Sequence, residues 1–457
     1  MKTLLTSAFL SLVLTGASPV RAVGADTGGV VLPEEVMPQL RPLLETALRQ
    51  SPRVLERNLD LAGARAEGYV ARSTSWPRAG GYLQYQAQRE TRADVYNSTT
   101  KTYGDATSLN EKFYYNFSVT QPVWEWGTLA AARRISRIDE DLAQLRHVEA
   151  YGALAAEIRA NYLALILAKI AVRNADHARQ MAEENLVRDQ ARLDEKQVTG
   201  GVVAGSQLRV DETTLAAKRA QADLDYLLGN FCLLCGISDL AVAEIPDQIA
   251  DLSTGPVLPD PPAAGEPDNA QIQAAEKEVE KCRLGLVAPR FALFPKFALV
   301  AGVSRDEINR DLDAYKKYQT NTWYGGAQVN WTIFDGFGTK GRRLAAYTRL
   351  RRAELRLTSL RATAVRDRGR EAQNLGFAWE AYRIAKRRHL GAIGGHSYVQ
   401  QLANRGEASQ TDVDSALHTM NVQQYASQQA LAAYLNACVR YVSARDMDPL
   451  GKPPVQY

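Results

Sequence analysis

The sequence predicts a mainly helical fold, in which a unit of long antiparallel helices and a two-strand β-hairpin occurs twice. The first observation is the spacing of the prolines. No proline lies between Pro122 and Pro246, or between Pro295 and Pro449, and a proline inside a helix costs about 3 kcal/mol or more. The second observation is that short segments of alternating apolar and polar residues precede each proline-free stretch, as expected of β-strands.

The first proline-free stretch is expected to form a helix far longer than those of ordinary globular proteins. Residues 128–198 contain one glycine, Gly152, and are rich in Ala, Leu, Arg, Glu and Gln, which are strong helix formers. At about 1.5 Å per residue, roughly seventy residues form a rod about 100 Å long. Apolar residues recur there at steps of three and four, so we expect such helices to pack side by side.

Four segments have the alternation of strands, at about 81–88, 113–121, 296–304 and 323–332. Polar loops are expected to join the strands of each pair, over 89–111 and 305–321. One face of each strand is apolar and aromatic, and the other is polar. This pattern suits the wall of a membrane barrel, with lipid outside and water inside, or a water-soluble sheet with one buried face.

The two copies are expected over residues 25–245 and 269–447, separated by a proline-rich linker at 246–268 and followed by a tail at 448–457. Each copy opens with a helix of moderate length, over 40–73 or 269–287, that ends before a proline. Corresponding features lie 218, 210 and 205 positions apart at the proline, the strand end and the helix tip. We attribute this drift to changes in loop length.

Residues 1–24 are predicted to be a signal peptide. Lys2 supplies the positive charge, residues 4–14 form the apolar core, and small residues allow cleavage after Ala22 or Gly24. No later apolar run reaches 18 residues, so no transmembrane helix is predicted. If the strands lie in a bilayer, four of them cannot close a wall, and several copies must share one barrel. Two copies would supply eight strands and three would supply twelve.

Enzymatic, metal and nucleic-acid functions are not expected. The five histidines form no H-E-x-x-H motif and no close pair with metal-ligand spacing, and the chain has no G-x-S-x-G or phosphate-binding loop. We therefore predict no cofactor. Cys232 and Cys235 lie in an apolar helical segment and are expected to be buried packing residues. The arginine-rich stretch at 342–370 also carries acidic residues, so we interpret it as a solvated or salt-bridged helix face.

Two segments that join strand to helix carry a resemblance to a known family. Residues 121–127 read Q-P-V-W-E-W-G and residues 331–338 read W-T-I-F-D-G-F-G. They resemble the paired strand-to-helix motifs of TolC-like outer-membrane factors, of the form Q/W-P-L-F-D-x-G. The helix tips at 201–207 and 406–413 resemble the two periplasmic turns of that family. Thr332 departs from the usual proline, and Gly205 and Gln207 replace bulkier or acidic residues at the first tip. The motif residues are Gln121, Pro122, Trp124, Trp126, Gly127, Trp331, Phe334, Asp335, Gly336 and Gly338.

The resemblance implies a homotrimer with a shared twelve-stranded β-barrel in the outer membrane and an α-helical tunnel in the periplasm. Such a protein is the exit duct of a tripartite efflux pump or a type I secretion system. A periplasmic adaptor and an inner-membrane transporter of the RND or ABC class would be its partners, with outer-membrane lipid around the barrel. The alternative is a soluble periplasmic coiled-coil adaptor or scaffold, which would have one helical hairpin instead of two.

The resemblance also assigns candidate site residues near the tips. The family carries a ring of aspartates at its periplasmic entrance, and Asp412 occupies the first acidic position, while the second falls on Ser415, with Asp414 one residue earlier. Asp412 is expected to form an anionic pore constriction, to cap the return helix, or to do both.

The tip residues are expected to form tight turns and to contact the adaptor. Gly200, Gly201 and Gly406 would give the turns their freedom, and Val202 and Glu407 would lie on the contact surface. Four aromatic residues form a further group of candidates, at the places where a strand ends and a helix begins. These residues are expected either to fix that transition by packing or to form an interfacial belt. They are Trp124, Trp126, Trp331 and Phe334.

Overall fold

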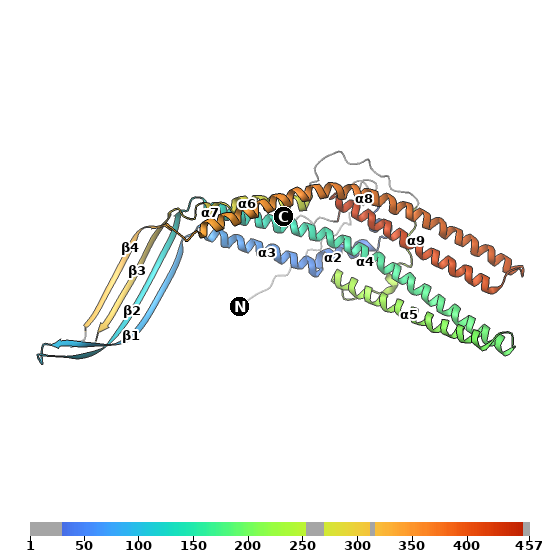
Figure 1. Ribbon diagram of the computed structural model, residues 1–457, viewed down its shortest axis with the longest axis horizontal. Helices are drawn as coiled ribbons and strands as arrows, with labels where there is room; N and C mark the ends of the chain where they lie inside the picture. The colour runs from blue at the N-terminus through green and yellow to red at the C-terminus, as the bar shows by residue number, and fades with distance from the viewer. Residues whose placement is uncertain (1–29, 253–268, 311–315, 451–457) are drawn as a thin grey trace, which may run out of the picture.

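The computed structural model describes residues 30–252, 269–310 and 316–450. The predicted signal peptide, most of the linker, residues 311–315 and the last seven residues lie outside this part of the chain. The described protein is elongated, with a four-stranded sheet at one end and two helix tips at the other (Figure 1). The mainly helical fold predicted from the sequence is confirmed.

The moderate helices of the two copies are both interrupted. The predicted helix over 40–73 is two helices, α2 (Leu40–Gln50) and α3 (Pro52–Ser73), preceded by a single turn, α1 (Pro33–Val36). The break follows from Pro52, because a proline keeps the preceding residue out of the helical region, and Ser51 has ψ 135°. The second copy has α6 (Ala270–Leu284) and a short α7 (Val287–Arg290).

The sheet is antiparallel, with the strand order β1-β2-β3-β4. Its strands are β1 (Arg78–Asn97), β2 (Thr102–Trp124), β3 (Lys296–Arg310) and β4 (Lys316–Asn330). The prediction of polar loops over 89–111 and 305–321 is wrong, because both hairpins continue through most of these residues. Polar residues predominate in the extended part, so the alternation that marks a half-apolar strand is weak there.

Two long helices leave the sheet and return as hairpins. The outgoing helices α4 (Thr128–Asp194) and α8 (Gly338–Asn404) have 67 residues each. The returning helices are α5 (Gly200–Cys235), followed by the short η2 (Val242–Glu244), and α9 (Gln410–Ala444). Both ends of α8 lie 210 positions after those of α4. The predicted drift to 205 at the tip is therefore wrong.

The buried core lies halfway along the molecule, where α2 and the ends of α5 and α9 pack on the middle of α4. Leu154, Ile158 and Tyr162 place one face of α4 in this core, and the Tyr162 ring lies 5.9 Å from that of Phe231. Within the described residues, no helix combines the length and the apolar character that a membrane crossing needs.

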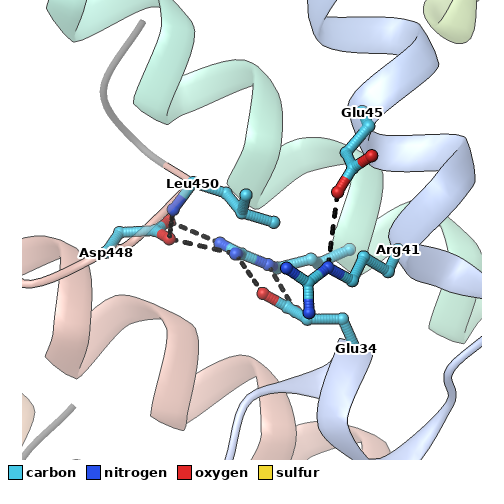
Figure 2. A network of polar contacts seen from close by, with 6 residues as sticks. Glu34, Arg41, Glu45, Asp448 and Leu450 are labelled. Atoms are coloured by element: carbon cyan, nitrogen blue, oxygen red, sulfur yellow. Dashed lines mark hydrogen bonds and ion pairs between the residues drawn. The ribbon is translucent and has the colours of Figure 1, made fainter. Parts of the chain in front are cut away.

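Arg159 is fully buried in this core and joins the two ends of the described chain. Its Nε donates to Glu34 Oε2 at 2.9 Å, and its Nη2 donates to Asp448 Oδ1 at 3.0 Å. Figure 2 shows Glu34 and Asp448 converging on the same guanidinium from different segments. Burial alone would lower the pKa of Arg159, but the two carboxylates outweigh that effect and raise it.

We expect Arg159→Ala to lower the free energy of unfolding by about 3–5 kcal/mol, because two buried carboxylates would lose their cation. Denaturant unfolding of the purified protein in detergent, followed by helical circular dichroism, measures this loss. Arg179→Ala is the control, because Arg179 lies in the same helix and forms an ion pair with exposed Glu183 at 2.8 Å. It should cost less than about 1 kcal/mol, and equal losses in both variants would contradict the prediction.

Candidate functional site

The two helix tips have the same backbone path. After α4, the Gln197 N–H donates to Arg192 O at 2.8 Å, and after α8, the Glu407 N–H donates to Leu402 O at 2.9 Å. Each bond spans a residue in the left-handed region, Lys196 with φ 60° or Gly406 with φ 79°. This is the Schellman arrangement, which ends a helix and pairs its last carbonyls.

The tip glycines do not all play the predicted role. Gly406 occupies the left-handed position, where glycine avoids the steric penalty of a side chain. Gly200 and Gly201 lie beyond the turn, in the first turn of α5, and Lys196 takes the left-handed position instead. The prediction that they give the first turn its freedom is therefore wrong. Val202 and Glu407 are both exposed at the tips.

Asp412 closes a capping box at the start of α9. The Ser409 backbone N–H and hydroxyl donate to Asp412 Oδ2 at 2.9 and 2.7 Å, and the Asp412 N–H donates to Ser409 Oγ at 3.2 Å. These bonds from Ser409 lower the pKa of the Asp412 carboxyl below its ordinary value. Asp412 is exposed, so it caps the helix and still presents a negative charge to solvent.

The neighbouring candidates have different surroundings. Asp414 is buried and accepts hydrogen bonds from Arg188 Nη2 in α4 at 2.8 Å and from Gln410 Nε2 at 3.0 Å. Its charge is therefore neutralised inside the protein, and the ion pair joins the two hairpins. Ser415 is exposed and uncharged. Sequence reasoning missed Arg188, because nothing in the pattern of α4 distinguishes it from the other arginines of that helix.

The strand-to-helix motifs share an unusual backbone. Trp126 and Gly127 have φ 54° and 82°, and the equivalent Gly336 and Phe337, each 210 positions later, have φ 60° and 67°. Each motif thus places two consecutive left-handed residues before its long helix, with glycine at one of the two positions. This geometry turns the chain sharply from the sheet into the helix.

Side chains of the motifs hold this turn in place. Trp126 donates its indole N–H to Pro295 O at 2.7 Å and lies 5.0 Å from the ring of Phe294. Trp331 donates its indole N–H to Leu293 O at 2.9 Å, although its ring is 61% exposed. Gln121 in turn donates its side-chain amide to Ser75 O at 3.0 Å. Trp124 and Phe334 remain exposed, so the packing interpretation describes Trp126 and not all four aromatics.

An acidic residue stands at the same place in both motifs. Glu125 Oε2 accepts from the Thr128 hydroxyl at 3.0 Å, and Asp335 Oδ2 accepts from the backbone N–H and hydroxyl of Thr339 at 2.8 and 2.6 Å. The bonds from Thr339 lower the pKa of Asp335. A carboxylate at a helix N-terminus is stabilised by the helix dipole, so these two acids favour the start of α4 and α8.

In the middle of the sheet, apolar and polar residues lie on opposite faces. Phe117, Val303 and Trp323 pair across β2, β3 and β4 and lie on the apolar face, where Trp323 is 83% exposed. Asn116, Ser304 and Thr322 pair on the opposite, polar face. An exposed apolar face of this extent indicates a surface that contacts lipid or protein.

No group of His, Cys, Asp or Glu within residues 30–252, 269–310 and 316–450 could hold a metal ion. Cys232 and Cys235 are unpaired and buried in the core, and burial raises the pKa of Cys235 to about 12. A thiol held in its protonated form does not act as a nucleophile.

Comparison with known proteins agrees with this geometry. Residues 267–443 match the family model described as outer membrane efflux protein. No curated protein sequence matches the chain. Among solved structures, the CmeC outer membrane channel of Campylobacter jejuni superposes with a TM-score of 0.72 at 15% identity, covering 96% of this chain and 94% of that one.

Two further outer membrane proteins share the fold. VceC of Vibrio cholerae has a TM-score of 0.65 at 18% identity, with 91% of this chain and 96% of that chain covered. The MtrE outer membrane channel of Neisseria gonorrhoeae, solved in its open state, has a TM-score of 0.65 at 16% identity, with 96% and 94% covered. The second copy therefore matches the outer membrane efflux protein family, and the whole chain has the fold of these outer membrane proteins.

Proposed function

We propose that this protein is the outer-membrane exit duct of a tripartite export system, in which three copies close one barrel and one tunnel. The observation that carries the proposal is that strands and helices follow the same lateral order. The sheet runs β1-β2-β3-β4, while α3 packs on α4, α4 on α6, and α6 on α8. Each strand continues into one of these helices, so a single wall runs from the sheet into the helices.

This wall has two open edges, β1 with α3 and β4 with α8. In a bilayer, the backbone groups of an unpaired strand edge have no water to bind, so the wall must close on further copies. The strands are long enough, since the shortest has 15 residues and a tilted membrane strand needs about 9–11. The apolar face would meet lipid, and the polar face would line the bore.

Three copies suit a duct better than two. A barrel of about eight strands, which two copies would form, has an interior that side chains fill, whereas a larger barrel leaves an aqueous channel. With three copies the barrel has twelve strands, and the helices α3, α4, α6 and α8 supply twelve members of the tunnel wall. The helical part would extend into the periplasm, away from the barrel.

The purified protein should have three times the mass of one chain in neutral detergent, resist dissociation by SDS without heating, and fractionate with the outer membrane. Light scattering with detergent correction measures the mass. A freely soluble monomer without conductance in planar bilayers would instead favour the periplasmic adaptor or scaffold alternative, and a twofold mass would reject the twelve-stranded barrel.

The tips would form the periplasmic entrance, with Asp412 from each copy as an anionic constriction. The capping box fixes the position of the carboxylate and favours its charged form. Three negative charges around one opening concentrate cations. Asp414 contributes no free charge, because Arg188 neutralises it, and Ser415 can offer only a hydroxyl.

We expect Asp412→Ala to reduce the cation selectivity of single channels and their block by divalent cations, because the constriction loses three charges. In the unmodified protein, the lowered pKa keeps Asp412 ionised at neutral pH, so selectivity should be lost only when the pH falls below the ordinary pKa of an aspartate. Ser409→Ala is the control, since it removes the cap but keeps the carboxylate. Unchanged selectivity in Asp412→Ala would exclude the ring and leave capping as the only role.

The exposed tip residues would form the docking surface for a periplasmic adaptor, which in turn would link the duct to an inner-membrane transporter of the RND or ABC class. We expect photo-crosslinkers at Val202 and Glu407 to yield adducts with the cognate adaptor, because both side chains are exposed at the two tips. The same crosslinker at Leu59, exposed on α3 and far from the tips, is the control. Absence of adducts at both tip positions would argue against docking there.

A further inference from the structure

A groove of about 810 Å³ lies where the sheet meets the helices. We call it the junction groove. It is lined by residues just after α3, the start of α4, residues between 285 and 292 around α7, and the start of α8. Four of its lining residues are basic and one is acidic. They are Arg78, Lys296, Arg342 and Arg349, with Glu125 as the acid.

The junction groove opens on the polar side of the wall. Arg78 pairs with Thr120, and Lys296 pairs with Asn330, so both basic residues belong to the polar face of the sheet. The groove also extends from Thr74, just after α3, to the start of α8, so it spans the wall between its two edges. In the proposed duct, this polar side becomes the interior when the wall closes.

The charges in the junction groove do not cancel. Lys296 Nζ pairs with Glu125 Oε2 at 3.3 Å, and Arg342 Nη2 pairs with Asp335 Oδ2 at 2.6 Å. Arg78 and Arg349 have no carboxylate within ion-pair distance among the residues that the structure describes. Each copy therefore adds two uncompensated positive charges to this hollow. Three copies would place six of them around the bore, in a concave site where field lines concentrate.

We propose that the junction groove is an anion-binding site that takes carboxylate, phosphate or sulfonate groups of exported molecules as they pass from the tunnel into the barrel. The proposal rests on the proposed duct, which makes the polar side the interior. Arg78 and Arg349 attract the anion through their positive charges. The neutral pairs at Glu125 and Asp335 fix the walls of the site. A molecule that lacks an anionic group passes without being held there.

Arg78 and Arg349 are replaced together to test the site. The probe is pyranine, a soluble trisulfonated dye, and its fluorescence anisotropy is titrated with the full chain in neutral detergent. The Arg78→Gln/Arg349→Gln variant should weaken dye binding about fivefold or more, as two partly screened ion pairs are lost in each copy. The Arg78→Lys/Arg349→Lys variant should bind within about twofold of the unmodified protein, because each charge is kept.

The matched control removes the same charge elsewhere on α8. Arg351 and Arg383 are exposed and lie outside the junction groove, and Arg351 is turned about 200° around the helix from Arg349. Arg351→Gln/Arg383→Gln should leave dye binding unchanged. An equal loss in this control would overturn the proposal, because the dye would then sense only the overall charge.

Competition distinguishes a soluble anion from a lipid headgroup. Inorganic phosphate should displace the dye, while phosphatidylglycerol in the micelles should not, because the polar side of the wall does not face lipid. Displacement by the lipid alone would overturn the proposal and place the groove on the outside. The duct proposal is tested separately: if it is wrong, the unmodified protein lacks conductance in planar bilayers, regardless of whether it binds the dye.

Discussion

The outer edges of β1 and β4 carry backbone N–H and C=O groups that no strand of the described chain pairs. On a soluble protein such edges can bind water, but in lipid each unpaired group costs several kcal/mol. The same sheet exposes an apolar face rich in aromatic residues, which water disfavours. Lipid on one face and identical copies at both edges satisfy the two requirements together. The order of the helices then follows, because every strand is covalently continued by a helix at the same place in the wall.

The two strand-to-helix motifs connect the sheet to the long helices in this order. At each one, two successive left-handed residues redirect the chain, an indole N–H binds a carbonyl of the segment before β3, and a carboxylate stabilises the start of the long helix. The molecule is otherwise thin, so its stability depends on the central core. There Arg159 binds Glu34 and Asp448 and ties both ends of the described chain to α4. This buried ion pair favours one packing of the two chain ends on α4, because a carboxylate that lost contact with Arg159 would be buried without a positive partner.

The sequence predicted those parts of the structure that repeat along the chain. Proline spacing and helix-forming composition indicated the long helices, and the period of two indicated the half-apolar parts of the strands. The sequence did not predict features that leave no pattern among neighbouring residues. The polar ends of the hairpins lack an apolar face, although backbone pairing keeps them extended. The left-handed conformation of Lys196 was not predicted, because lysine rarely adopts it. The turn was assigned instead to the nearby Gly200 and Gly201. Contacts between distant helices, such as Arg188 with Asp414, depend on how the hairpins pack and leave no periodic signal.

From the strand-to-helix motif to the helix tip, the offset of 210 positions shows that the two copies retain one backbone while their chemistry has diverged. Thr199 and Ser409 both stand at the N-cap, yet the third residue of the helix is Val202 in one copy and Asp412 in the other. The first tip thus offers an exposed apolar side chain where the second offers a carboxylate in a capping box. Apolar groups favour contact with another protein, whereas a fixed carboxylate acts on ions. The duplication therefore lets the two helix tips present different surfaces without altering the path of the wall.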